Sequence, residues 1–188
     1  MANKAYKFRL YPNLEQQAFL AKCFGCSRFV YNHFLRLVTD VYAESKKQLR
    51  YKDMAGLLTK LKQQESYAWL SEVNSQPLQQ TLKNLESAYV AFFKSRTAFP
   101  RFKRRSDNQS FRVPQHFSLT EDSKLKLPKM QPISIIIHRA IEGVMKSVTI
   151  SKSPTGKYYA SILVEYEHKP AALNGGKIGI DLQRLLLV

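Results

Sequence analysis

Cysteine and glycine are scarce in this chain, and their scarcity narrows the kinds of site that it can hold. The 188 residues include two cysteines, Cys23 and Cys26, which form a single C-x-x-C pair. A structural zinc site needs four ligands, so this pair predicts buried free thiols rather than a zinc centre. The seven glycines form no phosphate-cradling loop, and no Ser/His/Asp spacing indicates a hydrolytic triad.

Long apolar runs and acidic residues are also scarce. No run approaches the ~20 residues of a membrane-spanning helix. The first ten residues carry Lys4, Lys7 and Arg9 and lack a signal-peptide core, which predicts a cytoplasmic location. The chain has fourteen Asp and Glu residues and thirty Lys and Arg residues, which gives a formal charge of +16. A surplus of that size predicts a polyanionic partner, most often nucleic acid.

The N-terminal residues predict one strand followed by a helix. Residues 5–10 alternate apolar and basic side chains, which is typical of a half-buried strand with Lys7 and Arg9 on its outer face. Both cations are candidate nucleic-acid contacts. Asn13 is a favourable N-cap and Gln16 follows three residues later, so we expect a first helix as far as about residue 22. Gly25 then predicts a break.

A second helix is expected from residue 26, and it raises the question of a helix-turn-helix motif. Four-residue spacing stacks Arg28, Asn32 and Arg36 on one helical face. Such a face can read base edges in a major groove, although any helical hairpin shows the same pattern and a basic face is usually just solvated. Further helices are expected over residues 52–64 and from Pro77. The expected core residues of the helical region are Phe29, Phe34, Leu82 and Phe92.

The polar side of the helix from Pro77 and the segment after residue 95 are candidate nucleic-acid contacts. The helix presents Gln79, Gln80 and Lys83, which either contact a phosphate backbone or are simply exposed. The later segment has no acid and interleaves cations with aromatic rings: Phe99, Arg101, Phe102, Lys103, Arg104 and Arg105. Cations neutralise phosphates and rings stack on unpaired bases, which favours binding over a charged interdomain connector.

The rest of the chain predicts β structure and ends on a candidate metal ligand. Strands are expected at 111–113, 125–127, 133–137, 146–150 and 158–166, with a hairpin turn at 153–156 and a linker at 174–176. Asp181 alternates with Ile178 and Ile180, so on a strand it would face away from them. Two-metal phosphoryl chemistry needs several carboxylates. Asp181 is therefore an incomplete site, and taken alone it fits a strand-end or turn residue better.

Seven blocks in order make the sequence resemble the TnpB (OrfB) family, the transposase-like RNA-guided nucleases of bacterial insertion sequences. They read YKFRLYP (6–12), GCSRFVYN (25–32), WLSEV (69–73), LQQTL (78–82), AY with FF (88–89 and 92–93), FPRFK (99–103) and GIDL (179–182). The resemblance spans nearly all of this chain and about the first half of such a protein.

The resemblance implies an α+β fold of three parts. Residues 1–12 and 96–173 would form a split β-barrel domain of the wedge or OB-like kind. A helical recognition insertion with a helix-turn-helix-like start would occupy residues 13–95, and residues 174–188 would begin a truncated RuvC (RNase H-like) domain. Asp181 matches the family's first catalytic, magnesium-binding aspartate. The family's further glutamate and aspartate and its zinc-binding insert are absent here, and Gln183 replaces the usual glycine.

The implied function is the nucleic-acid-binding part of a transposon-encoded RNA-guided DNA endonuclease, which would not cleave alone. A frameshifted or interrupted copy would look like this. The expected partners are DNA and a guide-like RNA in the bacterial cytoplasm, with nucleoid association. No cofactor is expected for this chain, although the full-length family uses magnesium. Two alternatives remain open: a nuclease-dead DNA- or RNA-binding regulator from this family, and an unrelated basic RNA-binding structural protein.

Overall fold

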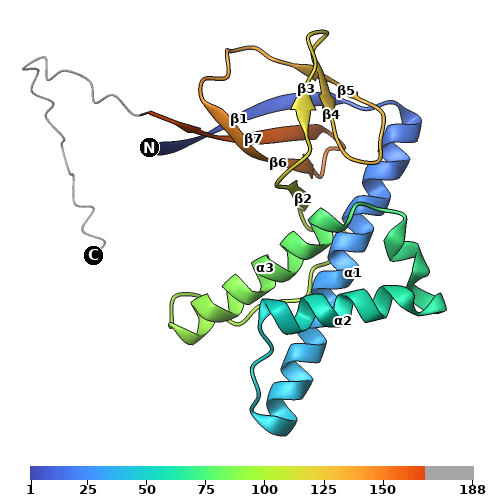
Figure 1. Cartoon of the computed structure of the whole chain (residues 1–188), viewed down its shortest axis with the longest axis vertical. Coiled ribbons are helices and arrows are strands. Elements are labelled where there is room, and N and C mark those ends of the chain that lie inside the picture. The colour runs from blue at the N-terminus through green and yellow to red at the C-terminus, as the bar shows by residue number, and fades with distance from the viewer. Residues whose placement is uncertain (168–188) are drawn as a thin grey trace, which may run out of the picture.

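The computed structural model describes residues 1–167, in which a helical region is inserted between the first two strands of a sheet (Figure 1). The elements follow in this order: β1 (Ala2–Tyr11), α1 (Leu14–Ser45), α2 (Tyr51–Gln63), a 3-10 helix (Glu65–Ser71), α3 (Ser75–Phe93), β2 (Gln109–Val113), β3 (Ser118–Leu119), β4 (Lys124–Lys126), β5 (Ile133–Ile136), β6 (Val144–Lys152) and β7 (Tyr158–Tyr166). The expected α+β class is confirmed.

The sheet is antiparallel, curled, and ordered β2-β6-β7-β1-β5-β4-β3 (Figure 1). The five expected strands of the C-terminal part are confirmed, and β3, which has only two residues, was not predicted. The turn at residues 153–156 is also confirmed, because the Ser153 amide donates to the Lys157 carbonyl at 2.8 Å. Gly156 has a φ of +79°, a conformation that glycine adopts without strain.

The alternation predicted for β1 is confirmed. Tyr6, Phe8 and Leu10 are buried on the core face, whereas Lys7 is exposed on the other. The β1 strand lies between β5 and β7, so the first ten residues of the chain occupy the interior of the sheet.

The expected break at Gly25 is wrong, because α1 runs through this position as one helix of 32 residues. A glycine inside a helix costs only about 1 kcal/mol relative to alanine. Buried side chains on both sides of it, including Phe24, Cys26 and Val30, offset that cost by packing against the core. The expected capping box at the start of α1 is confirmed: the Gln16 amide donates to Asn13 Oδ1 at 2.8 Å, and the Asn13 amide donates to Gln16 Oε1 at 2.9 Å.

The helix expected from Pro77 begins two residues earlier, at Ser75. Asn74 is its N-cap and accepts a hydrogen bond from the Gln76 amide at 2.8 Å. Pro77 therefore lies third in the helix rather than first. A proline is tolerated there because the first N–H groups of a helix have no intrahelical partner.

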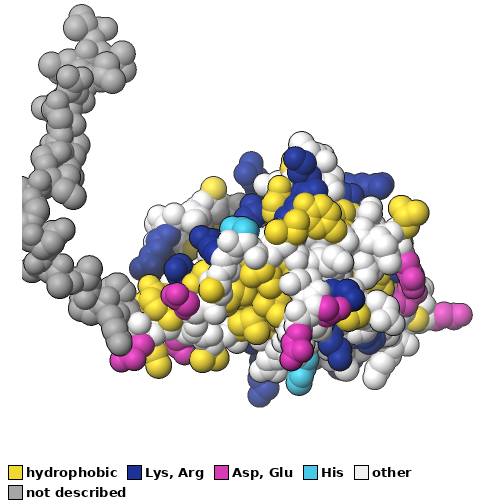
Figure 2. Space-filling view, turned by 90° about the horizontal axis from the view of Figure 1, so that it is seen from above, with side chains coloured by type: hydrophobic (Ala, Val, Ile, Leu, Met, Phe, Trp, Pro, Cys, Tyr) yellow, Lys and Arg dark blue, Asp and Glu magenta, His cyan; other side chains and the backbone are white. Residues whose placement is uncertain are grey.

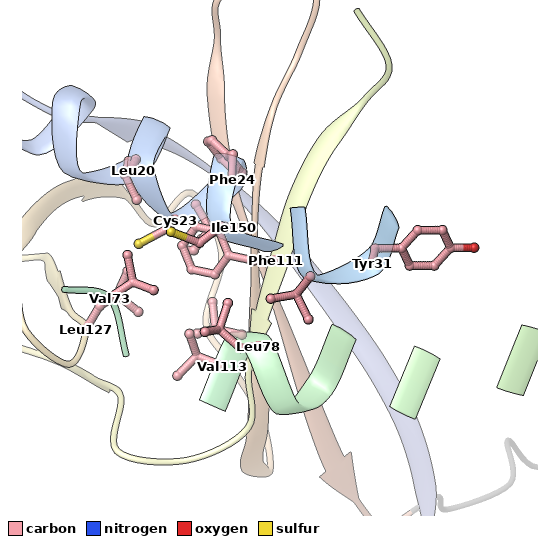
Figure 3. Close-up of a cluster of buried hydrophobic side chains, with 14 of the residues drawn as sticks. Leu20, Cys23, Phe24, Tyr31, Val73, Leu78, Phe111, Val113, Leu127 and Ile150 are labelled. Atoms are coloured by element: carbon pink, nitrogen blue, oxygen red, sulfur yellow. The ribbon is translucent and has the colours of Figure 1, made fainter. Parts of the chain in front are cut away.

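One core joins the helices to the sheet. Figure 3 shows Phe24 of α1, Leu78 of α3 and Phe111 of β2 converging from their separate elements. The rings of Phe24 and Phe111 lie 5.2 Å apart between centroids. Cys23 and Cys26 are buried and free, as expected, and burial raises the pKa of Cys23 to about 12 and that of Cys26 to about 11.

Two of the four expected core residues are correct. Phe34 and Leu82 are fully buried. Phe29 is half-buried and packs against the core, so the prediction holds in part for it, whereas Phe92 is half-buried and lies outside the core cluster of the described residues. Both lie in clusters of aromatic rings. Phe29 contacts Trp69 with ring centroids 5.0 Å apart, and Phe92 contacts Phe93 and Phe99 at the end of α3.

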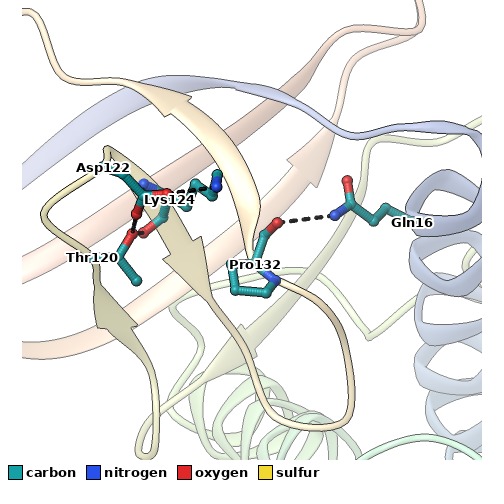
Figure 4. Close-up of polar contacts among 5 residues, drawn as sticks. All are labelled: Gln16, Thr120, Asp122, Lys124 and Pro132. Carbon is teal, nitrogen blue, oxygen red and sulfur yellow. Dashed lines mark hydrogen bonds and ion pairs between the residues drawn. The ribbon is translucent and has the colours of Figure 1, made fainter.

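Polar contacts fix the start of α1 against the β4–β5 connection (Figure 4). Gln16 Nε2 donates to the carbonyl oxygen of Pro132 at 3.0 Å, across 116 positions of sequence. In the neighbouring β3–β4 turn, the Thr120 hydroxyl donates to Asp122, and Asp122 pairs with Lys124. The helical insertion is therefore attached to the sheet at α1's first turn as well as through the core.

The expected division into a split barrel, a recognition insertion and a RuvC start stays a prediction. Asp181 and Gln183, like all of residues 168–188, lie outside the described residues. Within residues 1–167, no helix is long and apolar enough to cross a membrane.

Candidate nucleic-acid interface

The basic segment, residues 101–105, is held against α1 by the side chain of Asn32. Asn32 Nδ2 donates to the Lys103 carbonyl oxygen at 2.9 Å, and Asn32 Oδ1 accepts from the Lys103 amide at 2.8 Å. Both polar atoms of the Asn32 amide are thus used within the protein. Asn32 was predicted to bind nucleic acid, and that contact stays a prediction; its two hydrogen bonds to the Lys103 backbone hold Lys103 in position.

A turn follows the basic segment and leaves its arginine side chains without ion pairs among residues 1–167. The Arg104 amide donates to Asp107 Oδ2 at 2.7 Å, and Gln109 Nε2 donates to the Arg105 carbonyl at 3.1 Å. Asp107 therefore binds backbone rather than a cationic side chain. The described residues provide no ion-pair partner for Arg101, Arg104 or Arg105, whose side chains are exposed.

Lys103 lies over an aromatic ring of α1. Its Nζ is 4.3 Å from the centroid of the Tyr31 ring, which is a cation–π distance. Lys103 is exposed as a residue, yet its ammonium is partly desolvated at this ring. Desolvation lowers the pKa of Lys103, and the Asp107 carboxylate opposes part of that shift.

A polar hollow of about 550 Å³, the α1 hollow, separates the middle of α1 from residues 103–110. It is lined by Ser27 and Arg28 from the helix and by Lys103 and Arg104 from the basic segment. Ser27 is 5% exposed, and its Oγ is buried without a hydrogen-bond partner within residues 1–167. A buried polar atom in that state costs about 1 to 3 kcal/mol. Arg28 is half-buried and likewise has no hydrogen-bond or ion-pair partner in that range.

The two predicted aromatic residues have different environments. Phe99 is 44% exposed but packs edge-on against α3, with its centroid 5.2 Å from Phe92 and 5.7 Å from Tyr89. Phe102 is 56% exposed and has no ring neighbour among the described residues. Phe102 is the better placed of the two to stack.

The other predicted cations of the N-terminal half lie on separate surfaces. On the sheet, Lys7 Nζ is 4.6 Å from the Tyr159 ring centroid. Arg9 lies between Tyr11 and Tyr159, and its Nη1 is buried without a hydrogen-bond partner among residues 1–167. Arg36 is exposed on α1 and lies 3.8 Å from Asp40, too far for a strong pair.

The predicted residues of α3 do not line the α1 hollow. Gln80 Nε2 donates to Asn84 Oδ1 at 3.0 Å, and Lys83 Nζ is 5.1 Å from the ring centroid of Tyr51 in α2. Gln79 is exposed. Nothing in the structure tests nucleic-acid contact by these three residues.

Sequence reasoning missed Ser27, Tyr31 and Asp107. The run Ser106-Asp107-Asn108 carries a turn signal that could have been used. No local signal marks Ser27 or Tyr31, because their importance comes from a segment more than 70 residues away folding back onto α1.

Lys and Arg side chains are unevenly distributed over the face of the molecule that Figure 2 shows. Figure 2 shows Lys and Arg side chains gathered along the upper edge of one face beside exposed hydrophobic side chains, while most Asp and Glu side chains lie away from it. Residues 1–167 contain no group of three or more His, Cys, Asp or Glu side chains placed to hold a metal ion.

Two curated relatives match almost the whole chain. One is "Putative RNA-guided DNA endonuclease InsQ" of Escherichia coli (strain K12), 39% identical over 180 residues, which cover 95% of this chain and 44% of that protein. The other is "Putative RNA-guided DNA endonuclease" of Streptomyces pristinaespiralis, 35% identical over 95% of this chain and 45% of that protein. A family model for the OrfB helix-turn-helix domain of IS605-type elements matches residues 1–47.

This chain belongs to the TnpB (OrfB) family. It spans a little under half the length of these two TnpB-like relatives. Virulence protein VsdF of Salmonella dublin is also similar, 36% identical over 111 residues that cover 54% of the TnpB-family chain and 93% of VsdF. In this chain, the residues matched by the helix-turn-helix model comprise β1 and the continuous α1.

A solved structure also resembles the TnpB-family chain weakly. It is a chain of the Cas12f1–sgRNA–target DNA complex, with a TM-score of 0.45 and 11% identity over 89% of this chain and 49% of that one.

Proposed function

We propose that this chain is the nucleic-acid-binding N-terminal part of a transposon-encoded, TnpB-like RNA-guided DNA endonuclease. The observation that carries the proposal is the basic segment docked on α1, whose cationic side chains form no ion pair with an acid among residues 1–167. The similarity of 95% of the chain to two proteins named as RNA-guided DNA endonucleases supports it.

The proposal includes the partners and the division of the chain. DNA and a guide-like RNA are the partners, and the protein acts in the bacterial cytoplasm near the nucleoid. Residues 1–12 and 96–173 form a wedge-like split-barrel domain, and the helical recognition insertion is residues 13–95. Residues 174–188 begin a RuvC-type domain, in which Asp181 would be one oxygen ligand of a magnesium ion. That ion supplies charge neutralisation for phosphodiester cleavage in two-metal nucleases.

Salt dependence of binding tests the electrostatic part of this function. A surface that neutralises about six phosphates loses affinity for duplex DNA with a log–log slope near −5. Fluorescence anisotropy with labelled duplex DNA and single-stranded RNA measures this slope between low and moderate salt. Binding that stays flat over this range contradicts the proposal.

A four-residue variant identifies the surface. The basic-segment variant replaces Arg101, Lys103, Arg104 and Arg105 by alanine, and a control with the same charge replaces exposed lysines elsewhere, Lys47, Lys52, Lys60 and Lys157. We expect the first variant to weaken binding to all sequences and to shallow the slope by up to about 3.6. The control variant should change the slope much less. Equal effects would mean that binding follows net charge alone, and a loss limited to one sequence would mean that the segment reads bases.

A further inference from the structure

Three residues that carry hydrogen-bond donors line the α1 hollow: Ser27, Arg28 and Lys103. The Ser27 hydroxyl is buried and unpartnered, the half-buried Arg28 guanidinium has no partner in the described part of the chain, and the Lys103 ammonium is partly desolvated over Tyr31. Ser27 and Arg28 are adjacent on one helix, and the Asn32 amide fixes Lys103 one turn further on. The donors thus come from two segments whose relative position is set by hydrogen bonds.

The chemistry of these groups selects an anion. Guanidinium and ammonium groups only donate hydrogen bonds, and an oxyanion accepts several at once. The acid that lines the hollow, Asp107, has one carboxylate oxygen already bound to the Arg104 amide. The hollow is polar and open at about 550 Å³, which leaves room for a charged group that keeps part of its hydration.

We propose that the α1 hollow is a seat for one phosphodiester group, which accepts hydrogen bonds from Ser27 Oγ and the Arg28 guanidinium and pairs with Lys103 Nζ. This inference rests on the proposed function and sharpens it, because it fixes one point at which the nucleic-acid backbone is held. Ser27 and Arg28 position the backbone here and carry no sequence information.

Inorganic phosphate is the first probe, because it carries the same oxygens without a nucleic-acid chain. In a titration followed by amide chemical shifts, we expect the signals of Ser27, Lys103 and Arg104 to move and to saturate. The amide of Lys60, on the exposed face of α2, should stay in place. Sodium chloride at matched ionic strength should not reproduce the shifts.

Single substitutions then separate a phosphate seat from a merely structural role. Ser27→Ala removes one neutral donor, so affinity for a labelled oligonucleotide should fall about 3- to 10-fold while the salt slope stays the same. Its melting temperature should equal or exceed that of the parent chain, since the hydroxyl has no partner to lose. Arg28→Gln should weaken binding and shallow the slope for duplex DNA by about 0.9.

Matched controls lie on exposed helical surfaces. Ser45→Ala, on the same helix, removes a hydroxyl that donates to the Val41 carbonyl at 2.8 Å, and Lys60→Gln removes one exposed charge. Each should change affinity less than twofold.

The outcomes separate this inference from the proposed function. If binding depends on salt but neither Ser27→Ala nor Arg28→Gln changes it, the phosphate seat is wrong and the proposed function stands. If phosphate causes saturable chemical-shift changes but the protein binds no oligonucleotide, the phosphate seat stands and the proposed function is wrong. A lowered melting temperature of Ser27→Ala, with no phosphate shifts in the parent chain, shows that the hydroxyl is structural and overturns the seat.

Discussion

Replacing Asn32 by alanine removes the side chain that holds the basic segment on α1. The substitution deletes two hydrogen bonds to the Lys103 backbone, of 2.9 and 2.8 Å, and leaves a backbone N–H and C=O without those partners. The Lys103 ammonium keeps its contact with Tyr31 only as long as the segment stays docked.

The magnitude follows from the two bonds. A hydrogen bond contributes about 0.5 to 1.5 kcal/mol net, so the pair stabilises the docked segment by about 1 to 3 kcal/mol. That free energy corresponds to a factor of about 5 to 150 in the equilibrium between docked and released segment. Nucleic-acid affinity is proportional to the fraction of molecules whose basic segment stays docked, so it falls less than the docking equilibrium does. We expect about a 2- to 10-fold loss of affinity.

Hydrogen exchange of the Lys103 amide measures the opening directly. Its exchange rate should rise by about 5- to 150-fold in Asn32→Ala. Asn32→Asp gives a graded comparison, because a carboxylate still accepts from the Lys103 amide but repels the Lys103 carbonyl oxygen. Asn84→Ala, which removes a surface amide from α3, is the control and should leave Lys103 unchanged. An unaltered Lys103 exchange rate in Asn32→Ala would refute the positioning role.

Three further predictions concern stability, thiol reactivity and catalysis. Phe34→Ala should lower the free energy of unfolding by about 3 to 5 kcal/mol in urea denaturation, whereas the half-buried Phe92→Ala should cost clearly less; equal losses would contradict the burial difference. Burial raises the pKa of Cys26 to about 11, so at pH 8 its thiol should react with a disulfide reagent far more slowly in the folded protein than in urea, and the folded rate should rise as pH approaches 11. A polypeptide of these 188 residues should not cleave labelled DNA or RNA with magnesium or manganese, because Asp181 offers too few oxygen ligands; cleavage that disappears in Asp181→Ala would contradict this.

Local patterns predicted the elements well where a single signal dominated. The alternation of β1 and the Asn13 capping box depend on neighbouring residues alone, and both are confirmed. The predicted helix break at Gly25 was wrong because tertiary packing competes with local helix propensity. The buried side chains on both sides of the glycine outweigh its modest cost to the helix. The half-burial of Phe29 was equally beyond local reasoning, since two of its ring neighbours, Tyr67 and Trp69, come from the later 3-10 helix.

The candidate site was predicted in composition but not in arrangement. The cations and rings of residues 99–105 were recognisable from their spacing, and the family membership was recognisable from the order of the seven blocks. The pairing of Asn32 with Lys103 spans 71 positions, so no periodicity within α1 could reveal it. The same fold-back creates the α1 hollow, which explains why Ser27 was overlooked.

The central position of β1 has a consequence for the order of events during synthesis. The β1 strand is synthesised before its partner β7, whose residues 158–166 are added more than 145 positions later. At about 5 to 20 residues per second, β1 waits on the order of ten seconds or more for that partner. The helices α1 to α3 are complete well before then, so the insertion can collapse first and keep β1 near the place where β5 and β7 will close around it.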